Sequence, residues 1–228
     1  MQSEVSRRPR GRGFDRLVRV DLGEVPYEAA AAAMRGWVAE CQAGTAGDRL
    51  FLLSHPAVVT YGPRTRPEHL PAAVSGLPTI EVDRGGQATY HGPGQIVGYL
   101  VAHIRDRGPA DVVRWLEHGV VAALDSLGFP ALRRDTEPGG PSLVGVWTPD
   151  GRKVASIGMR IRQGVSSHGF SLNVDPDMAV YDSFVSCGLS EPMTSLRVLA
   201  GEQGRPVPTE AAVRDALAAA LGAGPAAG

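Results

Sequence analysis

Apolar residues alternate with polar ones in several short stretches of the chain. This alternation predicts strands at residues 16–23 (RLVRVDLG) and 79–83 (TIEVD). The apolar run at residues 96–104 (IVGYLVAHI) has the length and the β-branched content of a buried strand. Residues 49–62 (RLFLLSHPAVVTYG) indicate a pair of strands that is interrupted at His55-Pro56. The first half of the chain therefore contains enough strands for a sheet.

Elsewhere apolar residues recur at helical spacing. A helix is predicted after Pro26, over residues 27–43 with Gly44 as its stop, and its apolar stripe places Cys41 in the core. A second amphipathic helix is predicted over residues 109–128. A final helix is expected after Thr209, which can cap its first turn. These helices can cover a sheet.

The region between the second and the last helix alternates again. Strands are predicted at 131–135 (ALRRD), 142–147 (SLVGVW), 152–161 (RKVASIGMRI) and 166–174 (SSHGFSLNV). Turn residues at 148–151 and at Gln163-Gly164 join the last three strands into an antiparallel meander. The predicted fold is α+β: a single domain over residues 14–228, with a mixed, largely antiparallel sheet and flanking helices.

Composition narrows the class of protein. A chain of 228 residues with 43% hydrophobic content can form one large domain, and a formal charge of -1 argues against a nucleic-acid binder. We find no apolar run long enough to span a membrane, and no signal peptide is expected. Two cysteines cannot make a disulfide scaffold, so we expect a cytoplasmic protein. The basic, aperiodic residues 1–13 are predicted to be a disordered arm.

The stretch Arg84 to Gln95 (RGGQATYHGPGQ) contains four glycines, a histidine and several hydrogen-bonding side chains. Glycines permit positive φ and let backbone amides approach a bound group, so the stretch is predicted to be a ligand loop for a phosphate, a carboxylate or an acyl oxygen. The alternative is a long glycine-rich hairpin without a ligand.

Lys153 is the only lysine among 23 basic residues, and all the others are arginine. Unlike arginine, lysine can give up its proton in a protein, which favours a chemical role over a chance surface position. Cys187 lies in FVSCGLS outside any periodic element, so it is the better candidate nucleophile, with an inert buried thiol as the alternative. Lys153 and His91 are candidates to activate it. The histidines show no paired ligand spacing, and we predict no metal and no cofactor.

Four segments, RGGQATYHGPGQ, GRKVASIGMRI, SSHGFSLNV and FVSCGL, occur in this order along the chain. In this respect the chain resembles the lipoate-protein ligase B family, the lipoyl(octanoyl) transferases. The resemblance implies a fold similar to biotin and lipoate ligases and class II synthetase cores. It implies transfer of an octanoyl group from octanoyl-acyl carrier protein to a lysine of lipoyl domains. The implied acceptors are the lipoyl domains of 2-oxoacid dehydrogenase complexes and the glycine cleavage H protein. Nucleic acid and membrane are not expected partners.

Carried onto this chain, the resemblance makes Cys187 the acyl-thioester nucleophile and Lys153 its pKa-lowering partner and later base. The residues implied to bind the acyl substrate are Arg84, Gly85, Gly86, Gln87, Ala88, Thr89, Tyr90, His91, Ser156, Ile157, Gly158, Gly169, Phe170 and Ser171. Further pocket candidates are His55, His168 and Asn173. Phe170 and Ser171 stand where smaller or aliphatic residues are common in the family, which leaves the acyl length open.

Three other functions compete with this interpretation. An ATP-dependent lipoate or biotin-type ligase on the same fold would activate a free acid and need no cysteine. A non-catalytic fatty-acyl binding module would only hold a chain in an apolar pocket. A cysteine hydrolase would pair Cys187 with His91 or His168, although nothing here resembles a protease signature.

Overall fold

A mixed six-stranded sheet forms the centre of the molecule. The computed structural model describes residues 14, 16–71, 76–188 and 191–225, so the predicted arm at 1–13 lies outside the described residues. The six strands of this sheet lie in the order β1-β2-β6-β9-β8-β7. Their bounds are β1 Val18–Glu24, β2 Arg49–Ser54, β6 Gln95–Val101, β9 Val165–Asn173, β8 Lys153–Arg162 and β7 Gly145–Trp147. Among the described strands of this six-stranded sheet, only the neighbours β1 and β2 are parallel, and every other neighbouring pair is antiparallel. The prediction of a largely antiparallel α+β domain is confirmed.

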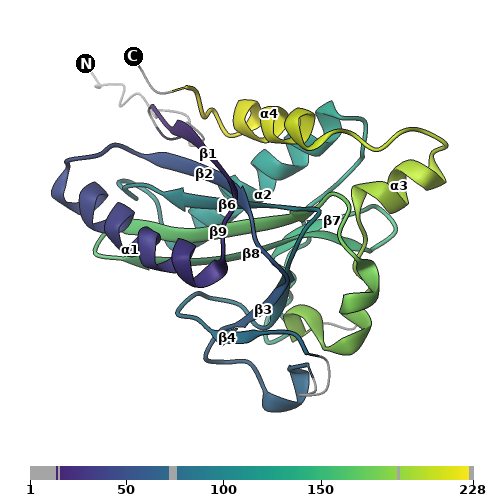
Figure 1. Cartoon of the computed structure of the whole chain (residues 1–228). Helices are drawn as coiled ribbons and strands as arrows, with labels where there is room; N and C mark the ends of the chain where they lie inside the picture. Colours follow the sequence, from purple (N-terminus) through teal and green to yellow (C-terminus); the bar gives the residue numbers. More distant parts are fainter. Residues whose placement is uncertain (1–13, 15, 72–75, 189–190, 226–228) are drawn as a thin grey trace, which may run out of the picture.

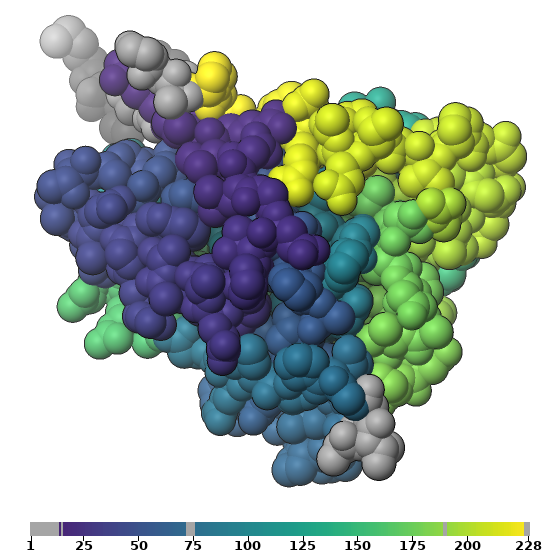
Figure 2. Space-filling view, in the orientation of Figure 1, coloured from purple at the N-terminus to yellow at the C-terminus, as the bar shows by residue number. Residues whose placement is uncertain are grey.

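A second, three-stranded sheet forms the lower tip of the molecule (Figures 1 and 2). Its strands are β4 (Thr79–Glu81), β3 (Val58–Tyr61) and β5 (Thr89–His91), in that order. The two strands predicted within residues 49–62 therefore belong to different sheets. Pro56 has no amide to donate to a strand partner, so the ladder of β2 stops before it and the chain changes direction. The predicted loop at residues 84–95 contains the strand β5.

Helices cover both faces of the large sheet (Figure 1). The helix α1 (Tyr27–Ala43) packs on one face, and α2 (Pro109–Ser126) and α4 (Glu210–Ala220) pack on the other. Strand β2 shows the division, because Leu50 and Leu52 join the cluster with α2, whereas Phe51 and Leu53 join the cluster with α1. A short helix, α3 (Leu196–Glu202), comes after β9 in the sequence and before α4.

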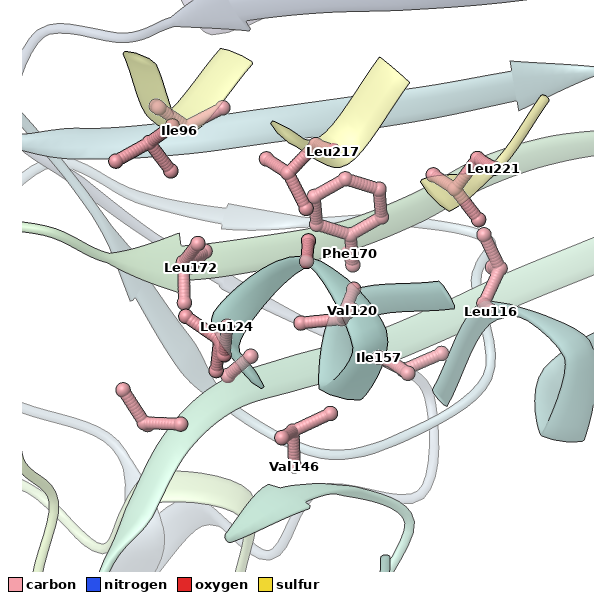
Figure 3. Close-up of a cluster of buried hydrophobic side chains, with 14 of the residues drawn as sticks. Ile96, Leu116, Val120, Leu124, Val146, Ile157, Phe170, Leu172, Leu217 and Leu221 are labelled. Atoms are coloured by element: carbon pink, nitrogen blue, oxygen red, sulfur yellow. The ribbon is translucent and has the colours of Figure 1, made fainter. Parts of the chain in front are cut away.

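The larger core cluster lies between the sheet and the helices α2 and α4. Figure 3 shows Phe170 and Leu172 of β9 beside Val120 and Leu124 of α2. A side chain at Gly98 of β6 would overlap the Phe170 ring, so this glycine makes room for the ring in the core. Truncating one such buried apolar side chain to alanine costs about 2–5 kcal/mol of unfolding free energy.

The helix and turn signals of the sequence are reproduced. Gly44 ends α1 in the left-handed conformation, and the Thr209 hydroxyl accepts a hydrogen bond from the Ala212 amide at the start of α4. Gln163 and Gly164 both have positive φ, as expected for a tight turn between β8 and β9. The predicted strand at 131–135 is wrong, because this segment contributes only an isolated bridge between Leu132 and Trp147.

The two cysteines lie in different surroundings, and both are free thiols. Cys41 is 0% exposed in the cluster beneath α1, which confirms its predicted place in the core. Cys187 is half-buried in a turn. In the described ranges no helix is both long and apolar enough to cross a membrane.

Candidate functional site

A cavity of about 360 Å³ lies beside the large sheet, under the glycine-rich segment. Its volume falls within the range of small-molecule pockets, roughly 300–1,000 Å³. Most of the residues predicted to bind a substrate line it: Arg84, Gly86, Gln87, Thr89, His91, Lys153, Ser156, Ile157, Gly158, His168, Gly169, Phe170, Ser171 and Cys187. Segments from four parts of the sequence thus converge on one cavity.

The floor of the cavity is the sheet face that α1 leaves uncovered at one end. Successive strand residues point to opposite faces, and Phe170 and Leu172 occupy the core face. Gly169 and Ser171 therefore face the cavity, as does Ser156, which pairs with Ser171. Small residues at these positions leave space where larger side chains would fill the floor. Ile157 and Phe170 line the cavity as well, although both side chains belong to the core cluster of Figure 3.

The buried Arg84 side chain hydrogen-bonds to the backbone of its own glycine-rich segment. Its guanidinium donates hydrogen bonds to the carbonyls of Gly85 and Gln87, and to the carbonyl and hydroxyl oxygens of Thr60. The side chain is buried, and no carboxylate in the described part of the chain pairs with it. A buried cation satisfied only by neutral oxygens gives the cavity a positive potential. Gly158 permits this packing, because a side chain there would meet Arg84 and Gly85.

Strand β5 divides the predicted segment into two sets of side chains. Gln87, Thr89 and His91 line the cavity. Ala88 and Tyr90 point away from it, into a small cluster with Phe184. The period of two that separates them is the ordinary alternation of a strand. Ala88 and Tyr90 are therefore supporting residues in this structure rather than lining ones, and Gly85 does not line the cavity either.

Cys187 is held in a turn of unusual conformation. Its φ is +56°, a left-handed value that is uncommon outside glycine, within the short 3₁₀ segment Ser186–Gly188. The Cys187 amide donates to the Ala88 carbonyl, 2.7 Å away. Gly188 also has positive φ, and a side chain there would overlap the Gln87 amide. The turn thus places the thiol in the cavity by direct contact with the glycine-rich segment.

The surroundings of Cys187 lower the pKa of its thiol. Burial is the largest influence and raises the pKa, but the positive charge of Lys153 opposes it, together with hydrogen bonds from Ser156 and Ser186 and the charge of Arg84. The Ser156 hydroxyl lies 3.4 Å from the Cys187 sulfur. Because the combined effect lowers the pKa, a larger fraction of the thiol is ionised near neutrality than in a free cysteine.

Lys153 begins β8 and is 2% exposed. Its ammonium nitrogen lies 5.2 Å from the centre of the Trp147 ring, and no carboxylate in the described residues forms an ion pair with it. A side chain at Gly145 would overlap the end of the lysine. The Gly145 amide in turn donates to the buried carboxylate of Glu117, 3.0 Å away. The lysine is therefore tightly packed, and its positive charge acts on the Cys187 thiol.

A cluster of histidines and tyrosines forms the other end of the site. The Nδ1–H of His55 donates to the Val25 carbonyl at 2.6 Å, so its Nε2 accepts from the Tyr99 hydroxyl at 2.7 Å. Burial lowers the pKa of His55 and, more strongly, of His91, so both are neutral near pH 7. Within the described ranges, no three His, Cys, Asp or Glu side chains are grouped to hold a metal ion.

Two of the further pocket candidates support the cavity without lining it. His55 accepts the hydrogen bond from the Tyr99 hydroxyl described above, and Tyr99 lines the cavity. Asn173 accepts from the Gln95 amide at 2.7 Å and donates to the Thr194 carbonyl at 2.9 Å. It thereby ties β9 to the segment that follows Cys187. His168, the third candidate, lines the cavity.

The sequence did not single out several lining residues: Tyr27, Arg64, Val97, Tyr99, Gly140, Pro141, Ser142 and Val144. Val97 and Tyr99 could have been found from the alternation of the predicted strand, since they share a face. The segment around residues 140–144 offers no such signal, because its place over the cavity depends on the tertiary fold.

The chain is similar to a described protein family and to several known proteins. Residues 26–222 match the family described as the Lipoyl protein ligase A/B catalytic domain. An octanoyltransferase of Frankia casuarinae is 47% identical over 195 residues, which are 84% of this chain and 88% of that protein. An octanoyltransferase of Salinispora tropica is 42% identical over 209 residues, covering 88% of this chain and 91% of the relative.

Solved structures of lipoate ligases share the fold. The putative lipoate protein ligase Ta0514 of T. acidophilum superimposes with a TM-score of 0.70 at 17% identity, over 91% of this chain and 84% of that one. Lipoate-protein ligase A bound with ATP gives a TM-score of 0.64, also at 17% identity, with the same coverage of 91% and 84%. The lipoate-ligase fold expected from the sequence is confirmed.

Proposed function

Since the chain belongs to the Lipoyl protein ligase A/B catalytic domain family, we propose that it is an octanoyltransferase that uses Cys187 as a covalent acyl carrier. The donor is octanoyl-acyl carrier protein, and the acceptor is the lysine of a lipoyl domain. One observation carries this proposal: the cavity holds a cysteine of lowered pKa next to the only lysine of the chain. The family relationship supports the octanoyl group as substrate.

In the first half-reaction the Cys187 thiolate attacks the carbonyl carbon of the donor thioester. A carbon–sulfur bond forms to Cys187, and the bond to the thiol of the carrier protein breaks. The Lys153 ammonium gives its proton to the departing thiolate, so the carrier protein leaves as a free thiol. The positive potential from the buried Arg84 stabilises the negative charge that develops on the carbonyl oxygen.

In the second half-reaction the amine of the acceptor lysine attacks octanoyl-Cys187. Neutral Lys153 takes the proton that the attacking nitrogen must lose, and the Cys187 thiolate leaves as the amide forms. The enzyme returns to its starting state, a thiolate beside an ammonium. One side chain thus moves a proton in both halves of a ping-pong cycle. No cofactor is needed, because the thioester already activates the acyl group.

The exposed residues at the cavity suit acidic protein partners. Arg64 lines the cavity, Arg66 lies two residues further on, and both are exposed. Neither forms an ion pair with a described carboxylate. We propose that they face octanoyl-acyl carrier protein and the lipoyl domains of 2-oxoacid dehydrogenase complexes and the glycine cleavage H protein. The cytoplasm, where free thiols such as Cys41 and Cys187 persist, is the proposed location.

A choice of acyl donors tests the proposal against its closest competitor. Purified protein and a lipoyl domain are incubated either with octanoyl-acyl carrier protein or with free octanoate, ATP and Mg²⁺, and the mass of the lipoyl domain is followed. We expect one added octanoyl group with the carrier-protein donor alone. Modification with free octanoate and ATP, and none with the carrier protein, would instead identify an ATP-dependent ligase.

A further inference from the structure

A second, more open cavity of about 880 Å³ adjoins the acyl cavity. It lies along α1, between Met34 and Val38 of the helix, Val82 beyond β4 and Val165 of β9. Of the residues that line the two cavities, only Tyr27 and His168 line both. These two side chains therefore separate the cavities.

The length of the acyl cavity can be followed along the strands of its floor. Ser156 lies beside the Cys187 sulfur, and His168 pairs with Met159, three residues further along β8. Three residues of a strand advance about 10 Å. An extended octanoyl chain, a zigzag of C–C bonds of about 1.5 Å, reaches roughly 9 Å from its carbonyl carbon. A chain of eight carbons that extends from Cys187 along β8 would therefore end near His168.

His168 is fixed in place from several directions. Its Nε2–H donates to a carboxylate oxygen of Asp83, 3.2 Å away, and Asp83 forms an ion pair with Arg160. Its backbone amide lies 3.3 Å from the Met34 sulfur. The residue has a φ of +59°, a strained value that surrounding contacts must maintain. The imidazole is thus a rigid part of the cavity and cannot swing aside freely.

Tyr27, the first residue of α1, is held against the histidine cluster. Its ring stacks on His91 with an interplanar angle of 14° and a centroid distance of 6.0 Å. The His55 ring lies 5.2 Å from it on another side. Tyr27 is buried, so its ring is held by these contacts between the two cavities.

We propose that Tyr27 and His168 form the end wall of the acyl cavity and limit the transferred chain to about eight carbons. The proposal rests on the octanoyltransferase function proposed above. A longer chain attached to Cys187 meets this end wall. With the end wall removed, the same chain can continue into the second cavity, whose lining includes the apolar side chains of Met34, Val38 and Val165.

The experiment compares carrier proteins loaded with octanoyl, decanoyl and dodecanoyl chains. Acylation of the full-length protein is timed by intact mass for wild type, His168→Gly and Tyr27→Ala. Glycine suits the left-handed backbone at position 168, so the first substitution removes the ring without adding strain. Val38→Ala is the matched control, because Val38 lines the second cavity alone.

We expect the wild type and Val38→Ala to react with dodecanoyl at least about 10-fold more slowly than with octanoyl. In His168→Gly and Tyr27→Ala the dodecanoyl-to-octanoyl rate ratio should rise by about the same factor. A wild type that accepts dodecanoyl as fast as octanoyl would overturn the proposal without the need for any variant. So would two folded variants that keep the wild-type ratio. Failure of the wild type to be acylated by any chain would instead contradict the proposed function.

Discussion

The backbone amide of Cys187 donates a hydrogen bond to the carbonyl of Ala88, 2.7 Å away. This bond joins two segments almost a hundred residues apart in the sequence, the thiol-bearing turn and the glycine-rich segment. Gly188 packs against the Gln87 side chain at the same junction. The position of the thiol therefore depends on the glycine-rich segment, even where that segment makes no contact with the sulfur itself.

Substitution of Gly188 by alanine tests this junction. The new methyl group would overlap the Gln87 side chain, and the alanine backbone would have to keep the left-handed φ of +66°. We therefore expect a loss of about 1–3 kcal/mol in unfolding free energy and slow acylation. Gly204→Ala is the control, because Gly204 has a φ of +63° and no atom near the added carbon. It should lose only about 1 kcal/mol and keep full acylation. Urea unfolding and acylation rates check both, and equal activities in the two variants would refute the role of the junction.

Lys153 is predicted to act both as a charge and as a proton carrier. Removing the charge in Lys153→Ala should raise the pKa of the Cys187 thiol, because Lys153 is the largest of the influences that lower it. Lys153→Arg should raise that pKa less, yet transfer to the lipoyl domain should be slow in both variants, since guanidinium cannot give up a proton. The rate of thiol alkylation against pH, measured beside single-turnover transfer, separates the two roles.

The confounding factor for the arginine variant is space. Lys153 runs beside Gly145, where even a methyl group would overlap it, so the larger guanidinium has little room and can displace the thiol. Alkylation of Lys153→Arg with a near-normal pH profile would show that the thiol is still in place. Transfer at close to the wild-type rate in such a variant would rule out the base role.

Charge reversal at the exposed arginines Arg64 and Arg66 should impair encounters with acidic partners. Arg64→Glu with Arg66→Glu is expected to lower kcat/KM for octanoyl-acyl carrier protein roughly tenfold at low salt. The rate constant of the wild type should fall as ionic strength rises, and that of the double variant should fall less. Arg35→Glu, at an exposed position on α1 that does not line the acyl cavity, is the control. A wild-type rate constant independent of salt would contradict electrostatic steering.

Buried neutral histidines should make the fold sensitive to acid. Burial, with the charges of Arg84 and Arg160, lowers the pKa of His168 from 6.5 to about 4. Between these values the unfolded chain binds a proton that the folded chain does not, so stability is present above pH 6.5 and is lost as the pH falls toward 4.

His168→Asn removes this titration and keeps a residue that tolerates the left-handed backbone. The decrease in unfolding free energy from about pH 7.5 to about pH 5 should become smaller by about 2 kcal/mol in this variant. The same substitution at the exposed His118, which lies on α2 and lines neither cavity, is the matched control. Urea unfolding at the two pH values measures the decrease in unfolding free energy for the wild type and both variants. An identical pH dependence in all three proteins would show that His168 is not the source of the acid sensitivity.

Local patterns were sufficient to predict the longer helices α1, α2 and α4 and the meander, whereas α3 was missed and the substrate-binding residues came from the family resemblance. The spacing of apolar residues identified α1 and placed Cys41 in the core, and the absence of other lysines drew attention to Lys153. The sequence could not show that β2 and β3 belong to different sheets, because each reads locally as an ordinary strand. Tyr27 was missed for a similar reason, since its place in the cavity arises from the packing of α1 on the large sheet.

The proposed mechanism requires that an octanoyl group becomes attached to Cys187 and then moves to a lipoyl domain. Intact mass and peptide mapping after incubation with octanoyl-acyl carrier protein, followed by a chase with the lipoyl domain, measure this directly. We expect one octanoyl group on Cys187 that disappears as the lipoyl domain gains it. The adduct should be retained in Cys41→Ala and absent in Cys187→Ser. An adduct on Cys41, or transfer that continues in Cys187→Ser, would rule out the covalent role of Cys187.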